Sequence, residues 1–172
     1  MKKALKYFPL VAAALALIAL IVGLAAPAVV YDSVIGENVS YSGWKCTFGY
    51  AEKYSTVLGS GEVEVLSFSF WNLLTYILLL VGIVAAVLAF LKPDMALLGY
   101  VAAACFVGAT VLFFCACPST AFAGIKDTEI ADLLSLGAGA IVGAILSILA
   151  VLAAAASPVL TLLNKKKIIK LK

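Results

Sequence analysis

The four cysteines are the residues of this chain whose type and spacing could do chemistry. Cys115 and Cys117 form a Cys-x-Cys pair, while Cys46 and Cys105 stand alone. Thiols can form disulfides, act as nucleophiles or bind metal ions. The chain contains no histidine, and its twelve basic residues are all lysines. Ser-His catalysis and histidine-based metal sites are therefore excluded, and we expect no metal and no other cofactor.

Any such site would have to be held in place by four long apolar runs. They cover about residues 7–26, 68–91, 95–117 and 133–163, and none contains a lysine or an acidic residue. Each is long enough, at 1.5 Å per helical residue, to cross the ~30 Å hydrocarbon layer of a bilayer. Only 12% of the residues are charged, against about 25% in soluble domains. We therefore predict an all-α membrane protein, a four-transmembrane-helix bundle.

The segments between the runs differ in length and character. Residues 27–67 form a long loop in which short β-prone stretches alternate with glycines, which predicts a small β-rich extracytoplasmic domain. Residues 118–132 form a second outer loop, and residues 164–172 form a basic tail. Lys92-Pro93-Asp94 is so short a connection that the second and third helices must form an antiparallel hairpin.

Lysines and acidic residues fall on opposite sides of the predicted spans. With the N-terminus in the cytoplasm, nine lysines and one acidic residue, Asp94, are cytoplasmic, whereas the outer loops hold three lysines and eight acidic residues. Cytoplasmic segments of membrane proteins carry an excess of lysine. We therefore expect a multi-pass protein of the plasma membrane with both termini in the cytoplasm. The lysine-only basic set and the N-terminal sequence favour a bacterial source.

The first run has a second interpretation, as a secretory signal peptide. Lys2 to Lys6, the apolar residues that follow and Ala26-Pro27-Ala28 match the order of signal-peptide regions. Signal-peptide apolar regions have about 7–15 residues, whereas this run has 20 residues without a charge. A retained helix is therefore favoured, and cleavage would leave three spans in the same orientation.

Small residues recur at helical spacing in the fourth run. Gly139, Gly143 and Ser147 lie four residues apart, so they share one helix face on which another backbone can approach closely. This stripe predicts a helix-packing interface. It would serve either an oligomer or partner, or the packing of this protein's own bundle.

The outer cysteines allow two kinds of chemistry. Cys46 in the long loop shares the extracytoplasmic side with Cys115 and Cys117, and disulfides persist in oxidising compartments. A disulfide between Cys46 and either Cys117 or Cys115 is therefore a hypothesis, while Cys105 is expected to be a small core residue. The outward cysteines on four spans also resemble, in outline, the membrane oxidases that reoxidise periplasmic disulfide catalysts. That resemblance implies a thiol–disulfide oxidoreductase.

The string Gly43-Trp44-Lys45-Cys46 carries a resemblance to a second family. With four spans, cytoplasmic termini and a long β-rich first outer loop, the chain resembles the layout of claudins and their four-span relatives. Their first loop carries Gly-Leu-Trp-x-x-Cys and a second cysteine, whereas here one residue separates Trp44 from Cys46. The resemblance implies that Trp44 anchors the loop on the outer leaflet. The alternative is an aromatic side chain packed within the loop.

The basic tail has two compatible interpretations. It contains five lysines: Lys165, Lys166, Lys167, Lys170 and Lys172. Lysines near an anionic membrane surface contribute ~1 kcal/mol each to binding, so the tail could contact lipid headgroups. It could equally fix the orientation of the last span.

The absences narrow the function classes. No ionisable residue lies within any run, although proton relays and ion-coupled transporters need them. The leading prediction is a non-catalytic integral membrane scaffold, adhesion or accessory protein that presents its extracytoplasmic loop to a partner. The alternatives are an oligomeric pore or transporter subunit and a membrane thiol–disulfide oxidoreductase. Expected partners are membrane lipid, other membrane or extracytoplasmic proteins and a second copy of this chain, but no nucleic acid.

Overall fold

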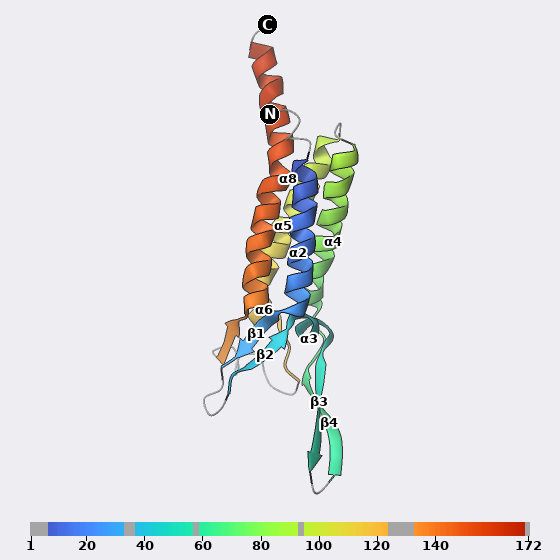
Figure 1. Cartoon of the computed structure of the whole chain (residues 1–172), viewed down its shortest axis with the longest axis vertical. Helices are drawn as coiled ribbons and strands as arrows, with labels where there is room; N and C mark the ends of the chain where they lie inside the picture. The colour runs from blue at the N-terminus through green and yellow to red at the C-terminus, as the bar shows by residue number, and fades with distance from the viewer. Residues whose placement is uncertain (1–6, 33–36, 57–58, 93–94, 124–132, 171–172) are drawn as a thin grey trace.

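Four long helices lie side by side in the computed structural model, which describes residues 7–32, 37–56, 59–92, 95–123 and 133–170 (Figure 1). The helices are α2 (Phe8–Ala25), α4 (Phe70–Leu91), α5 (Ala96–Phe114) and α8 (Ala138–Lys170). Each contains at least 18 residues that are apolar enough to cross a membrane. This supports the predicted multi-pass membrane protein with four spanning helices.

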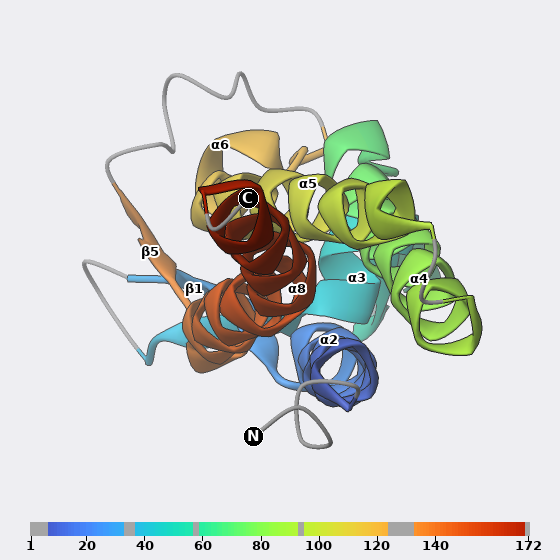
Figure 2. The ribbon, with the colours of Figure 1, turned by 90° about the horizontal axis from the view of Figure 1, so that it is seen from above.

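The helices form a closed ring in which each packs on two others. Helix α2 contacts α4 and α8, and α5 contacts the same two helices from the other side. Seen from above, α5 and α2 lie on opposite sides of the bundle (Figure 2). Helix α2 begins and α8 ends at the same end of the bundle (Figure 1).

Small and large side chains together fill the centre of this ring. Ala12, Ala16 and Ala19 of α2 are fully buried, and their spacing of four and three residues places them on one helix face. Phe106 and Leu79, also fully buried, come from the facing helices. Alanines on one side let the helices approach closely, and the large side chains fill the remaining space.

A three-stranded antiparallel sheet covers one end of the bundle. Its order is β2 (Val39–Ser42), β1 (Pro27–Tyr31) and β5 (Leu134–Leu136). Strand β1 follows α2 directly and β5 leads into α8, so the packing of these two helices brings the two strands together. The run predicted to span the membrane over 133–163 therefore starts as a strand, and its helix begins at Ala138.

The remaining elements extend this cap, which we define as the three-stranded sheet with β3, β4, α3 and α6. Strands β3 (Tyr50–Thr56) and β4 (Gly59–Leu66) form a hairpin that projects away from the bundle (Figure 1). Helix α3 (Gly43–Phe48) precedes it, and α6 (Ala116–Ser119) follows α5. Gly49 joins α3 to β3 with φ +89°, a conformation that side chains with a Cβ rarely adopt.

The ends of the third and fourth runs differ in part from their predicted spans. Helix α5 ends at Phe114, and Cys117 belongs to the separate helix α6. Helix α8 continues through Pro158 and extends past the other helices at the end opposite the cap (Figure 1). Most of the second predicted loop, residues 124–132, lies outside the described residues.

Candidate functional site

Helix α3 lies against the ends of α2 and α4 at the cap end of the bundle (Figure 2). The Gly43 N–H donates to the Ala26 carbonyl at 3.3 Å, and the Tyr76 hydroxyl donates to the Gly23 carbonyl at 2.9 Å. A Cβ on Gly43 would collide with the Gly23 carbonyl oxygen and with the Tyr76 hydroxyl. Because Tyr76 lies about 9 Å along α4 from its first residue, α3 is level with the first turns of α4.

Asn72 joins three segments at this level. Its side-chain amide donates to the Cys46 carbonyl on α3 at 3.1 Å and to the Thr120 hydroxyl, just after α6, at 3.3 Å. The Thr120 hydroxyl in turn donates to the Ala116 carbonyl at 2.8 Å. Among the described residues, every buried side-chain nitrogen and oxygen has a hydrogen-bond partner. The cap is therefore held on the bundle by satisfied buried hydrogen bonds.

Cys46 is buried beside this polar cluster, with 1% of its surface exposed. Its thiol donates to the Tyr41 carbonyl, with the sulfur and oxygen atoms 3.7 Å apart. Burial raises the pKa of the Cys46 thiol to about 11, and the charge of nearby Cys117 contributes to the rise. Burial also raises the pKa of the Cys117 thiol. All four cysteines are free thiols here, so a disulfide from Cys46 to Cys117 or Cys115 stays a prediction.

Five exposed aromatic side chains lie at the cap end of the bundle. They are Trp44 and Phe48 of α3 and Phe68, Phe70 and Trp71 at the start of α4. Trp44 is 58% exposed and packs on Phe48, with ring centroids 4.2 Å apart. We call these five residues the aromatic rim. Aromatic rings of this kind concentrate at the boundary between hydrocarbon and lipid headgroups.

The β3–β4 hairpin exposes polar and charged side chains on both faces. Lys53 and Glu62 face each other across the strands, with their charged atoms 3.2 Å apart, and both side chains are largely exposed to solvent. On the other face the Tyr54 ring lies over Gly61, which leaves no room for a Cβ. Val63 is 54% exposed. The hairpin therefore has little apolar core of its own.

The base of the hairpin is tied to the chain that follows α6. The Ser67 N–H donates to the Ala121 carbonyl at 2.9 Å, and the Ala123 N–H donates to the Val65 carbonyl at 3.1 Å. A two-stranded hairpin alone is marginally stable. These additional bonds fix the base of the hairpin relative to the chain after α6, and the rest of the hairpin projects away from the bundle (Figure 1).

The small-residue stripe lies inside the protein's own bundle. Gly139, Gly143 and Ser147 are all buried. A Cβ on Gly143 would meet the Phe113 ring at 2.7 Å, and one on Gly139 would meet the Ala26 and Pro27 carbonyl oxygens, each at 2.8 Å. The close approach that the stripe allows is thus made within one chain.

The described parts of the spans show no catalytic constellation. The hydroxyls of Thr75, Thr110 and Ser147 each donate to a carbonyl of their own helix. No group of three or more potential metal ligands occurs among the described residues. Of the basic tail, the backbone of α8 is described through Lys170. The side chains of Lys165, Lys166, Lys167 and Lys170, and all of Lys172, lie outside the described part.

Comparison with known proteins adds no functional assignment. The chain matches no known protein family, and no curated protein is significantly similar to it. The functional assignment therefore depends on the geometry of the site alone. Sequence patterns pointed to Trp44 and the cysteines, but they contained no signal for the partners of Asn72 or for the hairpin's attachment to residues 121–123.

Proposed function

We propose that this protein is a non-catalytic membrane scaffold that presents the β3–β4 hairpin to a partner protein outside the cytoplasm. The observation that carries the proposal is the exposed hairpin, held at its base and projecting past the sheet (Figure 1). Because both faces of the hairpin are exposed, its side chains and strand edges are available to another protein. The lysine distribution supports the orientation, because the cap segments are acidic and the opposite end is lysine-rich.

The cysteine environment supports a non-catalytic role over a thiol oxidoreductase. Reactive cysteines have a lowered pKa and lie near positive charges. Burial instead raises the pKa of both Cys46 and Cys117. The filled bundle centre, with Phe106 and Leu79 fully buried, likewise supports a scaffold over a path through a single chain.

Photo-crosslinking in living cells tests this proposal. A photoreactive amino acid replaces Val63 on β4, and the matched control replaces Val39 on β2, which is 45% exposed in the same cap. We expect a discrete protein adduct from position 63 and none from position 39. Adducts from neither position, or from position 39 alone, would contradict presentation by the hairpin.

A further inference from the structure

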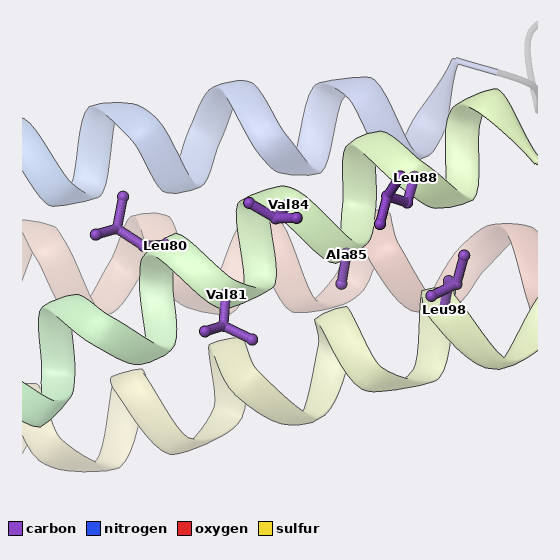
Figure 3. Close-up of a pocket in the computed structure, with 6 residues that line it drawn as sticks. All are labelled: Leu80, Val81, Val84, Ala85, Leu88 and Leu98. Carbon is purple, nitrogen blue, oxygen red and sulfur yellow. The ribbon is translucent and has the colours of Figure 1, made fainter.

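A shallow apolar groove runs along the outside of α4 where it packs on α5. Five of its lining residues come from α4, and Leu98 comes from α5 (Figure 3). The groove has a volume of about 320 Å³ and no polar lining atoms. Its α4 residues are Leu80, Val81, Val84, Ala85 and Leu88. From Leu80 to Leu88 the groove extends about 12 Å along the helix axis.

The groove lies in the half of the span farther from the cap. Helix α4 begins at the cap and ends at Leu91, so Leu88 is within one turn of the opposite end. Val84, in the middle of the groove, is 58% exposed. Exposed aliphatic side chains at this depth face hydrocarbon in a membrane protein, so the natural occupant is an apolar chain.

The side chains of the groove suit a flexible acyl chain better than a neighbouring helix. Membrane helices associate through small residues that let two backbones approach closely. The exposed groove residues Leu80, Val84 and Leu88 are all large aliphatics. The small residues Gly139 and Gly143 are already buried inside the bundle.

A lysine follows the end of the groove that lies farther from the cap, four residues after Leu88. Lys92 is exposed and follows the last turn of α4. Its backbone N–H donates to the Leu88 carbonyl at 2.8 Å. We propose that this groove binds one acyl chain of an anionic phospholipid whose phosphate contacts Lys92. The lipid belongs to the leaflet on the lysine-rich side, and the site is independent of the hairpin's role.

Native mass spectrometry of the full chain in detergent tests the site, with phosphatidylglycerol and phosphatidylcholine as probes. We expect tighter retention of phosphatidylglycerol. Lys92→Gln should weaken phosphatidylglycerol binding about fivefold, as expected for one lysine near an anionic surface, and leave phosphatidylcholine unchanged. Lys53→Gln is the matched control, because Lys53 lies on the hairpin and should change neither lipid.

Filling the groove gives a second, charge-independent measurement. Val84→Trp should remove the tightly bound phosphatidylglycerol. The control Val111→Trp alters a valine that is similarly exposed, at 55%, but lies near the cap end of α5, and should keep the lipid. Equal retention in both variants, or equal affinity for the two lipids, would show annular lipid only and overturn the proposal. Efficient Val84→Cys crosslinking between two copies would overturn it in favour of a dimer interface.

Discussion

At the level of single residues, the aromatic rim and the buried polar cluster occupy neighbouring positions but have different roles. Trp44 packs on Phe48 and is otherwise open, whereas Asn72 is 6% exposed and bonds to two segments. Open aromatics of this kind suit contact with a surrounding medium, and satisfied buried amides suit attachment. Each assignment makes a separate prediction.

Trp44 is expected to reside in the headgroup region of the bilayer. The chain contains two tryptophans, both in the aromatic rim, so Trp71→Phe leaves Trp44 as the sole tryptophan. In liposomes its fluorescence should be quenched more strongly by lipids labelled near the headgroup than by lipids labelled at the chain end. The Trp44→Phe variant, which reports on Trp71, serves as the comparison. Quenching of Trp44 by aqueous iodide alone would contradict contact with lipid.

Replacing Asn72 with alanine should loosen the cap. The change leaves the buried Thr120 hydroxyl and the Cys46 carbonyl without a donor, a loss that costs about 1–3 kcal/mol of stability. Thr110→Val is the control, because Thr110 bonds only within its own helix. Unfolding in detergent, followed by circular dichroism, measures both variants. Equal destabilisation of the two would argue against a special role for Asn72.

The Cys46 thiol should react slowly with maleimide at pH 8. With its pKa raised to about 11 by burial, only about one thiol in a thousand is ionised at that pH. Because the pKa is raised, the thiol stays protonated through neutral pH, and its rate of reaction with maleimide should increase as the pH approaches 11. Timed alkylation of the reduced protein, with peptide mass spectrometry, compares Cys46 with Cys115. Equally fast labelling of both at pH 8 would contradict the buried environment.

At the level of elements, the sequence predicted the helices better than the cap. The four runs lack charges over spans that suit a bilayer, so apolar length alone located α2, α4, α5 and α8. Leu134–Leu136 carries no charge either, and only its pairing with β1 makes it a strand. Helix α3 has six residues, too few to show a period, and its place depends on contacts with α2 and α4.

The site was predictable only where single residues are distinctive. Trp44 and the cysteines stand out by type, and the order of the apolar runs places Trp44, Cys46, Cys115 and Cys117 at the same end of the bundle. The hydrogen bonds that position them join residues 26 and 48 positions apart. No local pattern encodes such distant partners, because tertiary packing decides them.

Gly43→Ala should displace α3 from its position beside α2. The new methyl group would collide with the Gly23 carbonyl oxygen and the Tyr76 hydroxyl, and overpacking of this kind costs about 1–3 kcal/mol. Gly108→Ala is the control, since its nearest neighbour is the flexible tip of Leu78 at 3.0 Å. Thermal stability in detergent measures both. Similar melting temperatures for the two variants would contradict close packing of Gly43 against Gly23 and Tyr76.

At the level of the whole molecule, the cap and the lysine-rich end occupy opposite ends of the bundle. Alkaline phosphatase, which is active only outside the cytoplasm, should be active when inserted between β3 and β4 and inactive when fused to either terminus. Green fluorescent protein at the C-terminus should fluoresce. The reverse pattern would invert the proposed orientation, and the lysine distribution is the physical reason we do not expect it.

The continuity of α8 gives this architecture a mechanical property. One rod of 33 residues joins a strand of the sheet to the far side of the bundle. At 1.5 Å per residue it is about 50 Å long, so a tilt of about 5° at the sheet displaces its distant tip by about 4 Å. Force applied to the sheet by a bound protein would therefore register as movement across the membrane, without any change in the helix itself.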